Sequence, residues 1–342
     1  MAKFRIVTPA SPGAHYNHEM EALSGIDAEI VEAPADEAAF TAVAHDADAI
    51  YGKGLPISAT IINQLEKCRV ISLGSVGVDS VDIAAASARG IPVTNVPDTF
   101  IEEVADHAMT LLLGGFRRLV EQDQMVRTGR WRDGRPQLSQ FPRLMGQTLG
   151  FIAFGHVARA VALRARPFGL RMLAYDPYVE ELVMPPYGVE PATLEEVLLQ
   201  SDFVSMHAPA TPEAFGMLTE KHFRMMKPGA VFINTGRGAT VDEAALITAL
   251  QQNWISHAAL DVLATEPPRQ DNPLLQMRNV TLTAHVASAS ARFDPARKRR
   301  VGQELALALT DRWPMSCVNP VVLAGLKARR WQPESMERGP NS

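Results

Sequence analysis

An arginine, a glutamate and a histidine in the second half of the sequence have side chains that could work together on one small anion. Arg237, Glu266 and His285 each come shortly after a short apolar run that is typical of a buried strand. A histidine exchanges a proton near neutral pH, and a neighbouring carboxylate favours its charged form and fixes the orientation of its ring. An arginine pairs with a carboxylate and polarises a carbonyl beside it. Because parallel strands in open α/β sheets present their carboxyl ends to ligands, we expect these three side chains to meet at one sheet edge.

The stretch from Leu149 to Asp176 has the layout of a dinucleotide-binding βαβ unit. An apolar run leads into Ala153-Phe154-Gly155, and apolar residues recur at helical spacing from Val157. Gly169 is placed to end that helix in a left-handed conformation. The glycine fingerprint is degenerate, because Ala occupies its first and third positions. An ordinary strand–helix turn is therefore the competing interpretation.

Asp176 strengthens the dinucleotide interpretation because it ends the second apolar run, 21 positions after Gly155. A carboxylate there can accept hydrogen bonds from ribose hydroxyls and would repel a 2′-phosphate, so it favours NAD over NADP. Beside a nicotinamide ring, the Arg–Glu–His set suits hydride transfer to a 2-oxo carbon while His285 delivers the proton. The reverse reaction would oxidise a 2-hydroxy acid.

Length and composition set the class of protein. A chain of 342 residues is too long for one ordinary core, which predicts two domains. Its net charge of -5 does not suggest nucleic acid as a partner, and it has no apolar run of transmembrane length. Only two cysteines are present, with no spacing typical of a metal site, so we expect a cytoplasmic protein without a metal.

Short apolar runs alternate with helical patterns along the chain, which predicts parallel sheets covered by helices on both faces. In the first hundred residues the predicted strands are 4–8, 28–32, 49–51, 70–73 and 92–96, with helices at 59–66 and 81–88. In the second half, strands are predicted at 203–206, 230–234, 257–261 and 280–283, and Asp242 is predicted to cap a helix over 243–250.

Two long helical patterns frame the second half of the chain. Thr99 and Glu102 have the spacing of a capping box before a helix that ends at 116, which would serve as a crossover or a dimer face. His107 on that helix is expected to order the crossover rather than to do chemistry. Residues 118–135 are polar and predict a loop or arm that reaches a partner subunit. A second helical pattern over 290–312 would return the chain to the first domain.

The predicted fold is therefore α/β, with two Rossmann-like or flavodoxin-like parallel-sheet domains and a cleft between them. Residues 1–100 and 290–325 would form a discontinuous substrate domain, and 101–289 the NAD-binding domain. The segment 326–342 is predicted to be a flexible tail.

Long stretches of the sequence closely resemble the D-isomer-specific 2-hydroxyacid dehydrogenase family. The resemblance covers roughly 70–320, and its motifs are RGIPVTNVPDTFIEEVADHA, GQTLGFIAFGHVARAVA, MKPGAVFINTGRGATVDEAALITAL, AALDVLATEPP and NVTLTAHVAS. It implies a two-domain NAD-dependent enzyme, usually a homodimer, that acts on a small 2-oxo or 2-hydroxy acid. The first candidates are glyoxylate and hydroxypyruvate.

The resemblance also implies roles for individual residues. Arg237 would clamp the substrate's carboxylate and carbonyl, Glu266 would be the partner of the histidine, and His285 would be the acid/base. Asp261 would hold the nicotinamide carboxamide, and the backbone N–H groups of Ser75, Val76 and Gly77 would bind the substrate carboxylate. The other residues expected to contact the cofactor are Gly155, His156, Val157, Asp176, His207, Pro209, Thr211, Thr235 and Gly236.

Some positions depart from the family pattern or keep an open interpretation. Ala153 replaces the usual first glycine, and Ala284 stands where a proline usually precedes the histidine. Lys53 follows a predicted strand and could meet a substrate anion, but a solvated lysine fits equally well. Two other functions share these motifs: an NAD(H)-sensing protein like the family's corepressors, and a dehydrogenase of another small anion such as phosphite.

Overall fold

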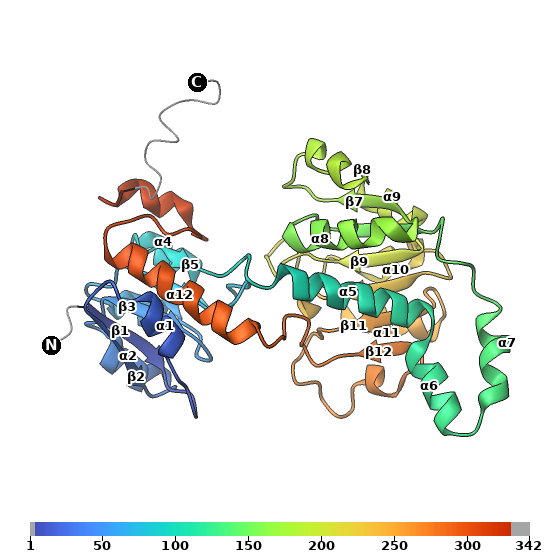
Figure 1. The fold of residues 1–342 in the computed structure, drawn as a ribbon, viewed down its shortest axis with the longest axis horizontal. Coiled ribbons are helices and arrows are strands. Elements are labelled where there is room, and N and C mark those ends of the chain that lie inside the picture. The colour runs from blue at the N-terminus through green and yellow to red at the C-terminus, as the bar shows by residue number, and fades with distance from the viewer. Residues whose placement is uncertain (1–3, 330–342) are drawn as a thin grey trace. The chain divides into compact units, whose positions relative to one another are not determined.

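The structure, a computed structural model, describes residues 4–329, and the chain divides into two compact units (Figure 1). Unit 1 joins Met1–Thr99 to Ser290–Ser342, and unit 2 is the continuous segment Phe100–Ala289. Most of the predicted flexible tail, 326–342, lies outside the described residues. Within the described chain, every helix is too short or too polar to span a membrane.

In the described part of unit 1, five parallel strands form one sheet in the order β2-β1-β3-β4-β5. Their bounds are β1 Phe4–Pro9, β2 Ala28–Ala33, β3 Ala49–Gly52, β4 Ile71–Leu73 and β5 Val93–Thr94. Central strands β3 and β4 are buried along their whole length, as the apolar runs predict for a sheet that is covered on both faces.

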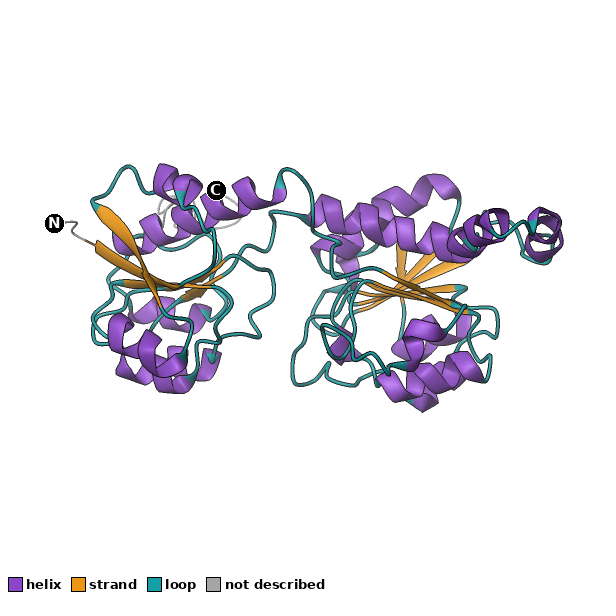
Figure 2. Ribbon diagram, turned by 90° about the horizontal axis from the view of Figure 1, so that it is seen from below, coloured by secondary structure: helices purple, strands orange, loops and turns teal. Residues whose placement is uncertain are grey.

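Helices cover both faces of this sheet (Figure 2). One face carries α1 (Asn17–Ala22) and α12 (Phe293–Leu309), which pack against each other, so the second half of the chain completes the first domain. The other face carries α2 (Glu37–Ala44), α3 (Ala59–Gln64) and α4 (Ile83–Ala88). Each of these three begins where a side-chain oxygen accepts a backbone N–H of the first turn, from Asp36, Ser58 and Asp82 respectively.

Unit 2 contains a sheet of seven parallel strands in the order β12-β11-β10-β9-β6-β7-β8, counted over the described residues. The order reverses between β9 and β6, which is the point where open α/β sheets bind dinucleotides. The strand bounds are β6 Thr148–Ile152, β7 Arg171–Tyr175, β8 Val189–Pro191, β9 Phe203–Met206, β10 Val231–Asn234, β11 His257–Leu260 and β12 Val280–Leu282.

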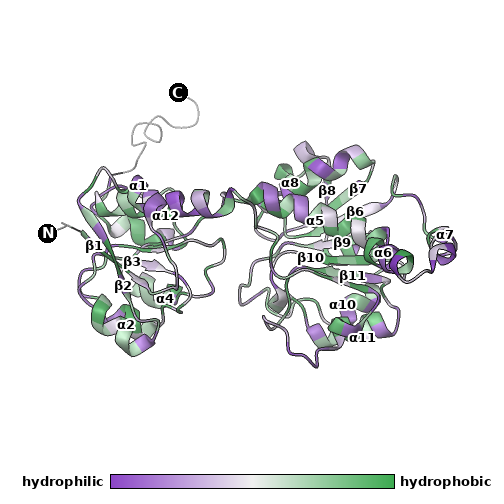
Figure 3. Ribbon diagram, turned by 60° about the horizontal axis from the view of Figure 1, so that its bottom comes forward, coloured by the Kyte–Doolittle hydropathy of each residue, from purple (hydrophilic) through white to green (hydrophobic). Residues whose placement is uncertain are grey.

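Two helical layers enclose the sheet of unit 2 (Figure 2). The core on one face is shared by α5 (Ile101–Phe116) and α8 (His156–Ala165). The core on the other face is shared by α9 (Leu194–Gln200), α10 (Glu220–Met225) and α11 (Glu243–Gln251). Figure 3 colours the central strand β10 green, in keeping with its fully buried sequence Val-Phe-Ile-Asn. The predicted pair of parallel α/β sheets is confirmed.

The predicted elements agree with the observed ones except at a few sites. All the predicted strands lie within two residues of the observed bounds, and Asp242 caps α11 as expected. The capping box at Thr99 is wrong: the N-cap of α5 is Phe100, and it makes no side-chain capping bond. The predicted loop over 118–135 is also wrong, because this segment folds into α6 (Leu119–Arg127), a short 3-10 turn and the start of α7 (Gly134–Leu138).

Candidate active site

The site residues that were predicted in unit 2 lie at the carboxyl ends of its strands. Six strands contribute, because a parallel sheet brings the ends of β6, β7, β9, β10, β11 and β12 to one edge. In the same order of strands, the residues that come after them are Gly155, Asp176, His207, Arg237, Asp261 and His285. Arg237, Glu266 and His285 therefore belong to neighbouring loops, although the sequence separates them.

The turn after β6 is shaped for the close approach of a ligand. Ala153 adopts φ 70°, a left-handed conformation that explains why glycine is usual here and why alanine is strained. At Gly155, the N-cap of α8, an added Cβ would meet nothing within 4 Å, so the backbone is open to a large group. The N-terminus of α8 with its first N–H groups suits a pyrophosphate at this position.

Asp176 connects this turn to the end of β7. Its Oδ2 accepts the N–H of Phe154 at 2.7 Å, and its Oδ1 accepts the N–H groups of Tyr178 and Val179 at 2.8 and 3.2 Å. The carboxylate is thus fixed in direction while it remains half-buried. It lines a cavity of about 810 Å³, which also has four glutamates on its walls: Glu180, Glu181, Glu195 and Glu196.

His285 and Glu266 form a hydrogen-bonded pair. The His285 Nδ1 lies 2.6 Å from Glu266 Oε2, and Glu266 Oε1 accepts the N–H of Leu263 at 3.0 Å. Because Nδ1 donates to the carboxylate, a neutral His285 carries its free lone pair on Nε2. Both side chains are partly exposed, 47% for His285 and 36% for Glu266, so Nε2 is accessible to a substrate.

Asp261 holds the backbone around His285. Its carbonyl accepts the His285 N–H at 2.9 Å, and its carboxylate accepts the N–H groups of Val286 and Ala287, both at 2.9 Å. These bonds maintain His285 at φ 52°, a left-handed conformation that a histidine rarely adopts unaided. Asp261 therefore sets the direction in which His285 leaves the sheet.

A histidine and a threonine complete the surroundings of the buried Asp261 carboxylate. Thr283 Oγ1 donates to Asp261 Oδ1 at 2.6 Å, and His107 Nε2 lies 2.9 Å from Thr283 Oγ1. Burial alone would raise the pKa of Asp261, but hydrogen bonds from His107, Thr283 and two backbone N–H groups outweigh it and hold that pKa below its usual value. His107 thus ties α5 to the strand ends, the ordering role expected for it.

Arg237 is the N-cap of a 3-10 turn after β10. The Asn234 side chain organises this turn, since its Oδ1 accepts the Gly236 N–H at 2.9 Å and its Nδ2 donates to the Arg237 carbonyl at 3.1 Å. The neighbouring Thr235 hydroxyl is buried and has no hydrogen-bond partner among the described residues. A bound group with polar atoms would satisfy it, which fits a cofactor at this edge.

The loop after β9 packs against the turn of Arg237. A Cβ at Gly236 would lie 3.0 Å from the Ala208 carbonyl oxygen, so a side chain here would need a small shift of this loop. His207 Nε2 contacts Ser205 Oγ at 2.8 Å, and burial lowers the pKa of His207 to about 4, which keeps its ring neutral. Pro209 and Thr211 continue this loop.

Unit 1 contains the remaining predicted residues. Lys53 and the turn Ser75-Val76-Gly77 follow the adjacent strands β3 and β4. Lys53 Nζ donates to the Tyr16 hydroxyl at 2.7 Å, and that hydroxyl donates to Glu32 at 2.5 Å. Burial lowers the pKa of Lys53. The chain of Lys53, Tyr16 and Glu32 compensates the lysine's charge within unit 1, and the role of Lys53 toward a substrate stays a prediction.

Sequence reasoning missed the residues that orient the reactive groups. Thr283 lies two positions before His285, and Asn234 lies three positions before Arg237. A small polar residue shortly before a candidate catalytic residue is the sequence pattern that could have identified both. This pattern does not state which atoms would meet. The partnership of Asp261 with the backbone of 285–287 is visible only once β11 and β12 pair.

Comparisons with known proteins identify the family of the chain. Residues 109–287 match the family described as D-isomer specific 2-hydroxyacid dehydrogenase, NAD binding domain. A glyoxylate reductase from Korarchaeum cryptofilum is 40% identical over 78% of this chain and 81% of its own length. A D-3-phosphoglycerate dehydrogenase from Mycobacterium leprae is 33% identical over 83% of this chain, but this covers only 53% of that protein.

A solved structure extends the similarity to the fold. The NADPH-dependent glyoxylate/hydroxypyruvate reductase from Sinorhizobium meliloti, in complex with NADP and malonate, has a TM-score of 0.79 and 34% identity. The match covers 93% of this chain and 97% of that one. The family match spans more than half of the chain and includes the nucleotide turn, Arg237, Glu266 and His285. The chain therefore belongs to the D-isomer specific 2-hydroxyacid dehydrogenase family.

Proposed function

We propose that this protein interconverts a small 2-oxo acid and the corresponding D-2-hydroxy acid with NAD(H), and that His285 is its acid/base. The observation that carries this proposal is the 2.6 Å contact between His285 Nδ1 and Glu266 at the carboxyl edge of a dinucleotide-binding sheet. This contact fixes the tautomer and aims Nε2 away from its partner, which is what a proton donor to a substrate oxygen needs.

The chain's own residues handle the proton and the charge. When bound, the nicotinamide supplies or accepts the hydride at the substrate's C2. In reduction, protonated His285 gives its Nε2 proton to the 2-oxo oxygen, which becomes the hydroxyl. In oxidation, neutral His285 takes the hydroxyl proton on Nε2. Glu266 stabilises the imidazolium in both directions because its carboxylate accepts the Nδ1 proton in a hydrogen bond.

Arg237 would pair with the substrate carboxylate and polarise the 2-oxo group. The Asn234 side chain and the Thr240 hydroxyl both bond to the Arg237 carbonyl, at 3.1 and 2.7 Å, so the turn presents the guanidinium from a fixed backbone. The N–H groups of Ser75, Val76 and Gly77 would bind the same carboxylate, and Asp261 would meet the nicotinamide amide. These roles stay predictions.

The charge around Asp176 supports NAD over NADP. Five carboxylates line the adjacent cavity, and no lysine, arginine or histidine is among its described lining residues. A 2′-phosphate would enter this field without a cation to neutralise it, at a cost in affinity. The Sinorhizobium reductase is described as NADPH-dependent, so the proposal of NAD for this protein rests on the residues of its own chain.

Turnover with short 2-oxo acids is the first test of the function. NADH oxidation would be followed at 340 nm with glyoxylate, hydroxypyruvate, pyruvate and phenylpyruvate, for the wild type and for His285→Gln. General acid–base catalysis contributes on the order of 10²–10⁴-fold, so we expect a loss of that size in kcat. His45→Gln, at an exposed histidine of unit 1, is the matched control and should retain full activity. Tight NADH binding without turnover of any acid would contradict the enzyme proposal and favour a sensing role.

Cofactor preference is tested at Asp176. Asp176→Asn removes the negative charge and keeps an acceptor for the N–H groups of Tyr178 and Val179, although it replaces the acceptor of the Phe154 N–H with a donor. We expect the ratio of kcat/KM for NADPH over NADH to rise about ten-fold, since relieving roughly 1.4 kcal/mol of repulsion is a factor of ten. Glu180→Gln removes an equal charge from the same cavity and should change the ratio far less. A wild type that prefers NADPH would refute the NAD proposal.

A further inference from the structure

In the turn after β4 of unit 1, two consecutive backbone carbonyls accept hydrogen bonds from the segment that follows β5. The Ser75 carbonyl accepts the N–H of Val96 at 3.1 Å, and the Val76 carbonyl accepts the side-chain Nδ2 of Asn95 at 2.7 Å. A trans peptide is planar, with its N–H opposite its C=O. The N–H groups of Val76 and Gly77 therefore point away from the Asn95 segment.

These two N–H groups have no acceptor within residues 4–329, and Val76 as a whole residue is 43% exposed. Successive N–H groups that point the same way form a concavity that binds anions. The turn is kept in this shape by a third contact, in which Ser75 Oγ donates to the Gly77 carbonyl at 2.7 Å. The orientation of the concavity thus depends on what holds Asn95.

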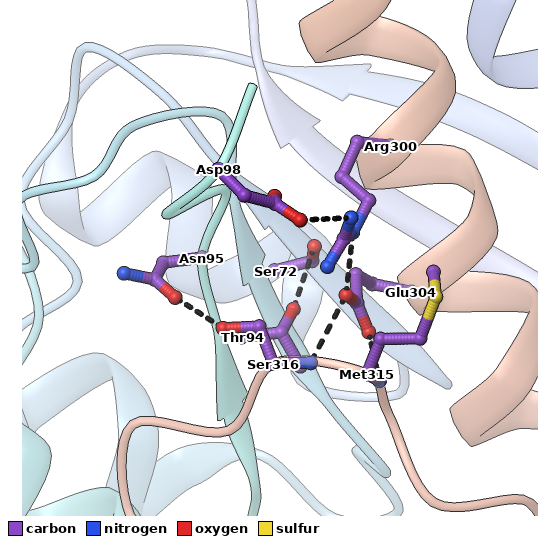
Figure 4. A network of polar contacts seen from close by, with 8 residues as sticks. All are labelled: Ser72, Thr94, Asn95, Asp98, Arg300, Glu304, Met315 and Ser316. Atoms are coloured by element: carbon purple, nitrogen blue, oxygen red, sulfur yellow. Dashed lines mark hydrogen bonds and ion pairs between the residues drawn. The ribbon is translucent and has the colours of Figure 1, made fainter. Parts of the chain in front are cut away.

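Asn95 reaches this turn because β5 is aligned with β4. Ser72 of β4 is paired with Thr94 of β5, and their hydroxyls hydrogen-bond at 2.8 Å in the interior of unit 1. Asn95 is the next residue, so its side chain emerges beside the turn. Its Oδ1 accepts the hydroxyl of Ser316, so both ends of the amide have partners and its orientation is determined (Figure 4).

Ser316 is in turn anchored to a fully buried carboxylate. Glu304, on α12, is 0% exposed and accepts the backbone N–H of Met315 at 2.8 Å and of Ser316 at 3.1 Å. Arg300 Nε bonds to Glu304 at 2.8 Å, and the same guanidinium bonds to Asp98 at 3.1 Å (Figure 4). Because the Glu304 carboxylate at the centre of this network is buried, losing one of its partners would leave its charge without compensation, which keeps the network in place.

We propose that Asn95 is a positioning residue for substrate binding, and that Ser316, held by Glu304, fixes its orientation. Asn95 does not touch the substrate. It holds the Val76–Gly77 peptide so that the N–H groups of the turn face the carboxylate of the 2-oxo acid. This inference rests on the proposed function, in which that turn binds the carboxylate.

Asn95→Asp tests the proposal most directly, because the aspartate has nearly the same shape but cannot donate to the Val76 carbonyl. In steady-state assays of the full-length protein with NADH, we expect KM for glyoxylate to rise about ten-fold. This is the scale of one lost charge-assisted hydrogen bond, here the bond from a turn N–H to the substrate carboxylate. Neither KM for NADH nor kcat should change by more than about two-fold, since uniform binding is what is lost. A general loss of structure would instead lower kcat and the melting temperature.

Asn279→Asp is the matched control. Asn279 also donates its Nδ2 to a backbone carbonyl, that of Leu250, at 3.2 Å, but it precedes β12 in unit 2, at the amino end of that strand and not at the carboxyl ends. The same substitution there should leave KM for glyoxylate unchanged. An equal rise in both variants would overturn the proposal.

Ser316→Ala tests the connection without touching the turn. We expect a smaller rise in KM for glyoxylate, about three-fold, because the amide of Asn95 loses one of its two partners. Ser316→Thr, which retains the hydroxyl, should restore the wild-type value. In the double variant of Ser316→Ala with Asn95→Asp, KM should equal that of Asn95→Asp alone, since Ser316 acts through Asn95. Additive effects would refute that link.

The outcomes separate this inference from the proposed function. If the wild type turns over glyoxylate but Asn95→Asp has an unchanged KM, the inference fails and the function stands. If the wild type turns over none of the acids, the function fails. Calorimetric binding of oxamate, an unreactive analogue of a 2-oxo acid, then decides the role of Asn95: weaker binding by Asn95→Asp supports it and equal binding overturns it.

Discussion

At the scale of single residues, His257 is a titratable group that unit 2 buries without a charged partner. It is the first residue of β11, is 2% exposed, and contacts the hydroxyl of Thr281 through Nε2 at 3.0 Å. Burial, with a smaller contribution from Arg118, lowers the pKa of His257 from 6.5 to about 3. The folded protein therefore holds this ring neutral at pH values where the unfolded chain binds a proton.

His257 should make the stability of the protein depend on pH. Because its folded pKa lies below its unfolded pKa, its contribution is complete above about pH 6.5 and declines as pH falls toward 3. At pH 5.0 the loss is about 2 kcal/mol, from 1.36 kcal/mol per pH unit. Urea unfolding at pH 7.5 and 5.0 would measure it. His257→Gln should flatten this dependence, whereas His45→Gln, at an exposed histidine, should not; an unchanged slope in His257→Gln would contradict the assignment.

The sequence predicted which side chains form the candidate site, but it did not predict how those side chains are oriented. Arg237, Glu266 and His285 follow apolar strands, so their position at one edge of the sheet follows from parallel pairing. The left-handed backbone of His285 does not follow, because it depends on bonds from Asp261 on the neighbouring strand. Asn95 is a similar case: its partner Ser316 is 221 positions away, and no local pattern connects them.

At the scale of elements, the loop after β10 and the loop after β11 touch through their backbones. A Cβ at Gly238 would lie 2.0 Å from the carbonyl carbon and oxygen of Leu263 and 2.6 Å from the Ala264 nitrogen. The same stretch bonds to Glu266, whose Oε1 accepts the Leu263 N–H. The two loops therefore share one rigid packing arrangement, and Glu266 depends on it.

Gly238→Ala should separate these loops and move Glu266 away from His285. Real backbones cannot accommodate a 2.0 Å contact, and a displacement of about 1 Å near the reacting groups costs on the order of 10²-fold in rate. We expect kcat to fall by about that factor, measured with NADH and glyoxylate. Gly229→Ala, where an added Cβ meets nothing within 4 Å, should leave kcat intact. Equal activity in both variants would rule out this coupling.

The longer elements with a buried face were predictable, whereas α6, which has no buried residue, and the short elements α9, α10 and β8 were not. The predicted strands are apolar runs between turn residues, and their bounds lie within two residues of those observed. Helix α6 was missed because none of its residues is buried, so its pattern had no core to match. It starts after Arg118, which adopts φ 52° and separates it from α5. The start of α5 was misplaced because Phe100, not Thr99, occupies its N-cap.

At the scale of the whole molecule, the segment 119–145 of unit 2 exposes large apolar side chains. Five are more than half exposed: Leu119, Val120, Val126, Trp131 and Met145. In Figure 3, α6 carries green stretches beside purple ones, as expected of a helix that covers one face with apolar residues. Large apolar side chains that gather on a surface mark interaction sites in soluble proteins. We propose that this segment joins two copies of the chain.

Sedimentation velocity would test the dimer. We expect the wild type to sediment as a dimer and the double variant of Val120→Glu with Trp131→Glu as a monomer, because burying two new charges without partners is unfavourable. Val321→Glu changes an equally apolar residue, 76% exposed, in unit 1 and should stay dimeric. A monomeric wild type would remove the basis for the proposal.

Unit 1 is built from two separate stretches of the chain, so it cannot be completed until the second stretch has been synthesised. Unit 2 is a continuous segment, so all of its strands and helices are available once residue 289 has been synthesised. Unit 1 must wait for α12, which packs against α1, and for Asn319, whose Oδ1 accepts the N–H of Val93. Domains usually fold in the order of their synthesis. We expect the reverse order here: unit 1 is completed only after unit 2, because residues 4–99 are synthesised before α12, which packs beside α1 on one face of their sheet.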